Sequence, residues 1–331
     1  MKQFKDGKLP VCRFGFPRPV TDKLVLRDVP TAVAGRRNLK ANSRLYDLPR
    51  KKGEQHINDY NPALLLTLES MLNEDQLRVY DFVKSTLDSN TPMRHFVSGV
   101  GGTGKSFLIK TIAKYVRETK RKDVAICAPT GMAASAISGQ TLHRLLQLPQ
   151  TVILIIDEIS MVSSLMLMFI HLRLSEIFNT FEEENAFFGN LHIMVFGDLL
   201  QLPPVDQNPP YESLSDGERV KHFGSMADFN LWKNLFTYDE LLINMRQKSD
   251  PSFCELLANV RLGRCTKADV KKLLARKLEF KTINSDARTK ELAQHLLDNP
   301  GKPVCLLPKK RMCKRLNDLR AVTMCSIEFS R

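Results

Sequence analysis

The most constraining stretch of this chain is residues 99–106, which read Gly-Val-Gly-Gly-Thr-Gly-Lys-Ser. A short apolar run within residues 93–98 precedes it, and residues 107–116 carry apolar side chains at helical spacing. The glycines therefore lie where a buried strand turns into a helix, where backbone N–H groups can approach phosphate oxygens. This pattern predicts a nucleoside triphosphate site, with ATP as the expected ligand. The predicted contacts are Gly99, Gly101, Gly102, Thr103, Gly104, Lys105 and Ser106. A glycine-rich turn without a ligand is the alternative.

The same pattern assigns chemistry to individual side chains. Lys105 is expected to reach the β- and γ-phosphates, and the Ser106 hydroxyl is expected to hold Mg²⁺. Residues 152–156 form an unbroken apolar run of the kind found in strands buried on both faces, and Asp157 and Glu158 follow it directly. We expect Asp157 to bind the Mg²⁺ through water and Glu158 to activate the attacking water. A surface acidic pair after a core strand is the alternative.

A third strand is expected over residues 193–196, followed by the block Gly-Asp-Leu-Leu-Gln-Leu-Pro-Pro at 197–204. The amide of Gln201 can donate to a γ-phosphate and accept from a water, which suits a sensor of triphosphate against diphosphate. The two prolines prevent a helix at the exit of this loop. Considered alone, the block is better explained as an ordinary turn.

Several blocks occur in a fixed order along the chain and together resemble one family. They are Ala128 to Ala134, Gly139 to His143, Ile156 to Val162, Gly197 to Pro204 and Asn244 to Gln247. In this order they resemble the PIF-type (petite integration frequency) DNA helicases, of the RecD-like branch of superfamily one. The resemblance covers roughly residues 72–247. It implies ATP-driven 5′-to-3′ translocation on single-stranded DNA with unwinding of tailed duplex DNA. It also implies roles in DNA repair, recombination and telomere maintenance.

The resemblance also assigns roles to further residues. Gln76 matches the glutamine that reads the adenine edge, since a carboxamide can donate and accept at once. Thr130 and Gly131 match a segment that touches the DNA backbone, and His143 lies in a corresponding DNA-facing block. Arg246 is expected to reach the γ-phosphate from the opposite lobe, as an arginine finger does. The alternatives are an ordinary helix glutamine, a core histidine and a surface arginine in a salt bridge.

The expected fold class is α/β, with a RecA-like P-loop NTPase lobe over residues 72–245 and a partial second RecA-like lobe over 246–331. Residues 12–19 and 57–65 resemble short blocks of Helitron transposon proteins, within a basic N-terminal segment 1–71. The metal-binding histidines and nucleophilic tyrosine of the Helitron replication module are not visible. This leaves an alternative function, an inactive nucleotide- or DNA-binding fragment of a mobile-element helicase.

Three departures from the family pattern qualify this reading. The stretch between His143 and Asp157 is shorter than the family's, and the late family blocks are not found before Arg331. The second lobe is therefore expected to be incomplete, with its first strand at 305–308 and a helix over 311–322. Residues 205–225 are polar and rich in Pro and Gly, which predicts a mobile loop.

Charge and cysteine usage agree with a DNA partner inside the cell. The net charge is +13, with +8 over residues 1–60 and +11 over 261–331, against −6 over 61–260. Basic flanks suit a phosphate backbone, although a short basic run is more often just a solvated surface. The seven cysteines form no CxxC pair, as expected for free thiols in a reducing compartment. No apolar stretch is long enough to span a membrane. The expected location is intracellular, in the nucleus or alternatively the mitochondrion.

Overall fold

A computed structural model describes residues 62–89, 91–142, 151–223, 230–282, 284–299 and 305–328. The first Helitron-like block, residues 57–61 of the second and His143 lie outside these described residues. Among the described residues, no helix combines the length and the apolar composition needed to cross a membrane.

The centre of the protein is a six-stranded parallel sheet with the order β3-β2-β4-β5-β1-β6. Three of these strands lie at the apolar runs of residues 93–98, 152–156 and 193–196, where the sequence predicts them. The parallel α/β architecture confirms the expected fold class. The strands are β1 (Arg94–Gly99), β2 (Asp123–Ala128), β3 (Gln140–Thr141), β4 (Thr151–Ile156), β5 (His192–Gly197) and β6 (Thr237–Leu241).

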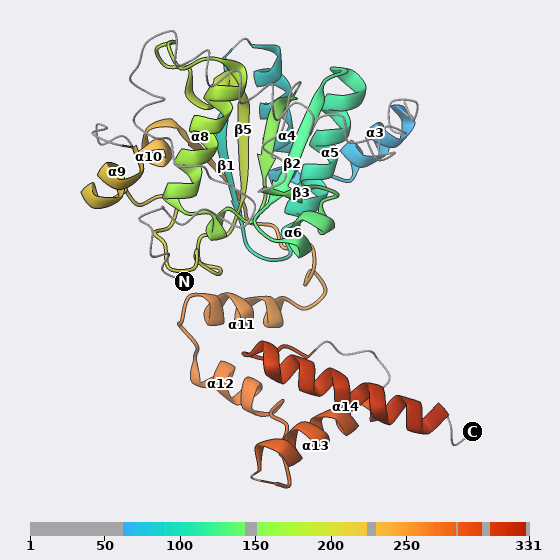
Figure 1. The fold of residues 1–331 in the computed structure, drawn as a ribbon. Helices are drawn as coiled ribbons and strands as arrows, with labels where there is room; N and C mark the ends of the chain where they lie inside the picture. The colour runs from blue at the N-terminus through green and yellow to red at the C-terminus, as the bar shows by residue number, and fades with distance from the viewer. Residues whose placement is uncertain are drawn as a thin grey trace. The chain divides into compact units, whose positions relative to one another are not determined.

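Helices cover both faces of this sheet (Figure 1). Alternate strand residues point to opposite faces, so Ile153 and Ile155 pack in one apolar cluster and Leu154 and Ile156 in the other. The first cluster includes α3 (Pro62–Ser70), α4 (Glu74–Asp88), α5 (Lys105–Thr119) and α6 (Gly131–Ala136). The second includes α8 (Ser164–Phe178), α10 (Leu231–Leu235) and the short 3₁₀ turns η3 (Ile159–Met161) and η4 (Phe187–Asn190). Burial on both faces explains why β4 and β5 are apolar at every position except their first residue.

The chain divides into two compact units, one ending at Leu262 and the other beginning at Gly263. The first unit ends with α11 (Pro251–Arg261), whose N-terminus is capped by the Asp250 carboxylate. The second unit contains α12 (Lys267–Leu274), α13 (Ser285–Asp298) and α14 (Lys310–Glu328). Its apolar cluster is small and joins Ala293 and Leu296 of α13 to Leu316 of α14.

The strand expected at residues 305–308 is not found, and this prediction was wrong. The apolar residues there form an irregular segment, because no other described residue of the second unit forms a strand with which they could pair. The helix expected to follow it is confirmed as α14.

The polar stretch at 205–225 also differs from its expectation as a loop, because it contains α9 (Asp216–Phe223). Acidic residues begin this helix, and Lys221 and His222 lie in its last turn. These charges complement the helix dipole and favour a helix despite the low apolar content.

Candidate nucleotide-binding site

The residues singled out from the sequence gather at one edge of the sheet. All six strands are parallel, so their carboxyl ends lie at the same edge. The phosphate loop follows β1, Asp157 follows β4, Asp198 follows β5 and the segment 242–247 follows β6. Open parallel sheets bind their ligands at this edge.

The phosphate loop requires glycine at two positions. Gly102 has a φ of +99° and Gly104 a φ of +81°, both in the region that favours glycine. A Cβ atom on Gly102 would lie 2.8 Å from Asn244 Oδ1, and one on Gly104 would overlap Gln76 Nε2. Neighbouring segments therefore approach the loop more closely than any side chain on these residues would allow.

Lys105 begins helix α5 and folds back over the loop. Its Nζ donates to the carbonyl of Gly99 at 2.5 Å and to that of Val100 at 3.2 Å. Burial lowers the pKa of Lys105, while the charges of Asp157, Glu158 and Asp198 act in the opposite direction. The ammonium group is thus held by two phosphate-loop carbonyls and lies within electrostatic reach of three carboxylates. Ser106 is the next residue of the same helix.

Asp157 is a buried carboxylate with spare acceptor capacity. It is only 5% exposed, and its Oδ1 accepts from the backbone N–H of Glu158 at 2.9 Å. Burial raises the pKa of Asp157 to about 6. Among the described residues, no cluster of three or more His, Cys, Asp or Glu side chains could enclose a metal ion. The Asp157 carboxylate and the Ser106 hydroxyl nevertheless offer the oxygen ligands that suit Mg²⁺, which keeps several waters and takes its other ligands from substrate phosphates.

Glu158 occupies a backbone conformation that non-glycine residues rarely adopt. Its φ and ψ are 54° and 46°, in the left-handed region, directly before the turn η3. Such a conformation costs on the order of 1–2 kcal/mol for a residue with a Cβ atom. The chain therefore turns sharply where β4 delivers its two carboxylates.

The loop after β5 is organised by Asp198, a residue to which the sequence pattern assigns no role of its own. Asp198 is 1% exposed and accepts two hydrogen bonds from Arg261, at 2.8 and 2.6 Å. It also accepts from the N–H of Leu200 and, at 3.3 Å, from Nε2 of Gln201. Burial alone would raise the pKa of Asp198, but these hydrogen bonds outweigh burial and leave it below its ordinary value. Arg261 could not be found from the sequence, because it lies in a different helix with no recognisable motif.

Gln76 lies behind the phosphate loop and is 2% exposed. Its Oε1 accepts from the backbone N–H of Asn73, and Asn73 Oδ1 accepts from the N–H of Gln76, which forms a capping box at the start of α4. Its Nε2 donates to the carbonyl of Thr103 at 2.9 Å. The amide thus joins the start of α4 to the phosphate loop.

Arg246 lies in the first unit, together with the phosphate loop. This differs from the expectation that it would enter from the opposite lobe, because the backbone N–H groups of Met245 and Arg246 bond directly to the Gly102 carbonyl, at 2.8 and 3.2 Å. The Arg246 side chain is exposed, and its charge contributes to lowering the pKa of Lys105. Within the described part of the chain, Arg246 forms no ion pair.

Thr130 and Gly131 lie after β2, at the same edge of the sheet. Thr130 caps α6 by accepting from the N–H of Ala133 at 3.3 Å, and Gly131 is exposed with open space around its Cα. His143, expected to lie near them, is outside the described residues.

Comparison with known proteins shows which family this chain resembles. The chain is 34% identical to the ATP-dependent DNA helicase PIF1 of Candida albicans over 51% of its own length and 21% of that protein. It is 30% identical to the Danio rerio protein of the same name over 64% of its length and 33% of that protein. A crystal structure of the Candida albicans Pif1 helicase aligns with a TM-score of 0.49 and 27% identity, over 69% of this chain and 54% of that one.

The aligned region thus spans a third or less of these two relatives. The model of the family described as PIF1-like helicase matches residues 71–152 and 144–271, more than half of the chain. The chain belongs to the PIF1-like helicase family.

Proposed function

We propose that the first unit binds and hydrolyses ATP as part of an ATP-dependent DNA helicase. One observation carries this proposal. The Lys105 ammonium is bonded to two carbonyls of a glycine-rich loop, at the carboxyl edge of a parallel sheet where Asp157, Glu158 and Asp198 also follow their strands. A cation and several carboxylates at one edge of the sheet, beside a glycine-rich loop, are suited to a Mg²⁺-bound triphosphate.

In this proposal each residue of the loop has a distinct task. Backbone N–H groups of the loop 99–106 would surround the phosphates, and Lys105 would exchange its contacts with the Gly99 and Val100 carbonyls for the β- and γ-phosphates. Ser106 and Asp157 would hold Mg²⁺, which supplies charge neutralisation for the transferred phosphoryl group. The Gln76 amide already bonds to the Asn73 N–H and to the Thr103 carbonyl. It would contact the adenine through its second N–H and the second lone pair of its oxygen.

Hydrolysis requires a base, a sensor and a compensating cation. Glu158 would accept the proton of the attacking water, and Gln201 would report the presence of the γ-phosphate. Arg246 would balance the negative charge that develops on that phosphate. The exposure of Arg246, without an ion pair among the described residues, supports this task, because a guanidinium already paired could not approach a phosphate freely.

We further propose that the nucleic-acid substrate is single-stranded or tailed duplex DNA. Thr130, Gly131 and His143 would contact the DNA backbone, and translocation would run 5′-to-3′. The basic flanks supply the charge for binding phosphates, and the protein would act inside the cell, in the nucleus or in the mitochondrion. The partial second RecA-like lobe expected over residues 246–331 would then correspond to the second unit, which begins at Gly263. Roles in repair, recombination and telomere maintenance follow from family membership as proposals.

The test of ATP binding is Lys105→Ala, measured by titration calorimetry with Mg²⁺ and a non-hydrolysable ATP analogue. We expect binding to fall at least a hundredfold, since a charge-assisted contact to phosphate is lost. Lys110→Ala is the matched control, because Lys110 is an exposed lysine of the same helix. Equal affinity in the Lys105 variant and the parent protein would overturn the proposal.

The DNA proposal has its own test. Affinity for a fluorescent single-stranded oligonucleotide should fall steeply as salt rises, because bound cations are released when Lys and Arg contact phosphates. An affinity that is independent of salt would contradict this mode of binding. Unwinding of a duplex with a 3′ tail but not one with a 5′ tail would contradict the proposed polarity.

A further inference from the structure

The segment that carries Arg246 is attached at two points. Its second half is fixed to the phosphate loop, where Met245 and Arg246 donate to the Gly102 carbonyl and Asn244 Nδ2 donates to the Gly101 carbonyl at 3.3 Å. The Asn244 side chain also accepts from the N–H of Gln247, which closes a turn.

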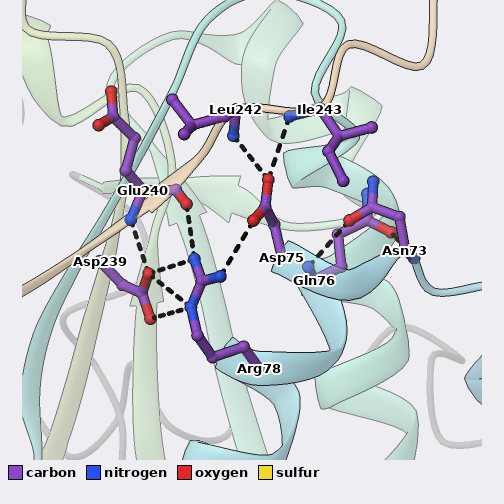
Figure 2. Close-up of polar contacts among 8 residues, drawn as sticks. All are labelled: Asn73, Asp75, Gln76, Arg78, Asp239, Glu240, Leu242 and Ile243. Carbon is purple, nitrogen blue, oxygen red and sulfur yellow. Dashed lines mark hydrogen bonds and ion pairs between the residues drawn. The ribbon is translucent and has the colours of Figure 1, made fainter.

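Its first half is fixed to a single carboxylate on helix α4. The N–H groups of Leu242 and Ile243 donate to the same oxygen of Asp75, at 2.8 and 3.1 Å. Figure 2 shows the Asp75 side chain directed at these two backbone groups, directly beyond the end of β6. Asp75 is separated from them by more than 160 residues in sequence, so this is a tertiary contact.

A guanidinium completes the arrangement around Asp75. Arg78, one turn further along α4, donates to the other oxygen of Asp75 at 3.0 Å, to Asp239 at 2.7 Å and to the Glu240 carbonyl at 2.8 Å (Figure 2). Burial on its own would raise the pKa of Asp75, but the N–H groups of Leu242 and Ile243 and the Arg78 side chain lower it overall. Asp75 is therefore a charged acceptor, and its hydrogen bonds are of the stronger, charge-assisted kind.

Gln76, the residue after Asp75, connects the same turn of α4 to the phosphate loop. Gln76 donates to the Thr103 carbonyl, and Asp75 accepts from the segment that bears Arg246. The first turn of α4 thus holds both the loop that would surround the phosphates and the arginine that would face them.

From this geometry we propose that Asp75 is a positioning residue, which sets Arg246 against the γ-phosphate by holding the backbone of Leu242 and Ile243. This inference rests on the proposed function, and it makes Asp75 a determinant of the preference for ATP over ADP. Asp75 touches neither the phosphate loop nor the nucleotide in this scheme, and acts only through the segment 242–247.

The experiment measures the affinity ratio between a non-hydrolysable ATP analogue and ADP, both with Mg²⁺, in the full chain. Asp75→Ala should reduce this ratio about tenfold, mainly through weaker triphosphate binding, because a misplaced cation loses its alignment with the γ-phosphate. Arg246→Ala should reduce the ratio to a similar extent. In the double variant, Asp75→Ala should add nothing further, because its effect passes through Arg246.

Two controls separate positioning from general damage. Asp239→Ala removes the other carboxylate partner of Arg78 without touching Leu242 or Ile243, and Asp81→Ala removes an exposed carboxylate of the same helix. Both should keep the parent ratio. If Asp75→Ala does not fold, Asp75→Glu replaces it in every arm, since it keeps the charge and displaces the acceptor by one methylene group.

The outcomes distinguish a failure of the positioning role from a failure of the proposed function. A parent ratio that survives Asp75→Ala or Asp75→Glu, additive losses in the double variant, or an equal loss in Asp239→Ala would each overturn the positioning role while leaving ATP binding intact. Failure of Lys105→Ala to weaken either nucleotide would instead overturn the proposed function itself.

Discussion

The ends of strands β4 and β5 each carry a buried aspartate, and the two differ sharply in their partners. Asp157 and Asp198 are 5% and 1% exposed. Burial raises the pKa of Asp157 to about 6, whereas four hydrogen bonds, two of them from Arg261, hold the pKa of Asp198 below its ordinary value. The protein therefore stabilises the charge of Asp198, at the end of β5, but does not fully stabilise that of Asp157, at the end of β4.

This difference separates a structural carboxylate from a functional one. A buried charge without a counter-ion destabilises the folded state, so it persists where a ligand supplies the missing charge. Asp157 has no ion pair among the described residues, and the charge of Lys105 lowers its pKa less than burial raises it, so Asp157 and Glu158 form the chemical end of the edge. Asp198 has its cation in Arg261 and holds the Gln201 loop in shape, which makes it the structural end.

The largest expected effect tests the chemical end. Glu158→Gln should leave ATP affinity unchanged but slow hydrolysis by about a hundred- to ten-thousand-fold, because the amide keeps the shape and loses the base. Single-turnover measurements of phosphate release would check this. The free energy of unfolding should stay within about 0.5 kcal/mol of the parent. Unchanged turnover would remove Glu158 from the chemistry.

The next effect tests the structural end. Arg261→Ala should lower the free energy of unfolding by about 3 kcal/mol, because it leaves the buried Asp198 charge unpaired. Urea denaturation of the parent and the variant would measure the loss.

The double variant Arg261→Ala with Asp198→Asn sharpens this second test. It should recover part of the lost stability, since the uncompensated charge is then removed. A loss that is the same in the single and double variants would mean that Arg261 stabilises the fold through packing and not through its charge.

A third effect is an increase in the free energy of unfolding, and it tests whether the Asp157 charge lacks sufficient partners in the fold. The folded-state pKa of Asp157 lies above the ordinary value of 3.8, so the folded protein takes up a proton as pH falls below about 6. Its ionisation therefore destabilises the fold above that pH. Asp157→Asn should raise the free energy of unfolding at pH 7, without Mg²⁺ or nucleotide, by about 2–3 kcal/mol.

The pH dependence of this gain provides its control. The advantage of Asp157→Asn should shrink as pH falls from 6 towards 4, where the aspartate of the parent is itself neutral. The variant should also lose Mg²⁺-dependent nucleotide binding. If Asp157→Asn destabilises the protein at pH 7, then Asp157 is as well satisfied as Asp198 and the comparison fails.

The smallest effect concerns the backbone of Glu158. Glu158→Gly relieves the left-handed conformation of this residue but adds freedom to the unfolded chain, and the two contributions oppose each other. We expect the free energy of unfolding to change by no more than about 1 kcal/mol while hydrolysis is lost. A destabilisation above about 2 kcal/mol would show that the Glu158 side chain stabilises the turn.

Local patterns were sufficient for much of the fold and for the phosphate loop. Glycine spacing and unbroken apolar runs depend on neighbours in sequence, so β1, β4 and β5 could be located from residues 93–98, 152–156 and 193–196. The same reasoning failed at residues 305–308, because an apolar run becomes a strand only where another strand can bond to it.

Contacts distant in sequence account for what could not be predicted. The Asp198–Arg261 pair and the bonds from Asp75 to Leu242 and Ile243 join segments whose proximity depends on the strand order of the sheet. Asp75 resembles any acidic residue in the first turn of a helix, where it would be expected to favour the dipole. Its tertiary partners become visible only once β6 lies beside β1.

Arg78 also affects the tendency of this protein to aggregate through the edges of its sheet. The sheet has two borders, β3 and β6, and a free border offers backbone groups to which a foreign strand can add. At one border, β3 is only two residues long and offers few backbone groups for pairing. At the other, Arg78 occupies the Glu240 carbonyl and sets a positive charge beside it. The Arg78 contacts at the end of β6, which help to order the nucleotide site, would thereby also hinder aggregation through this edge strand.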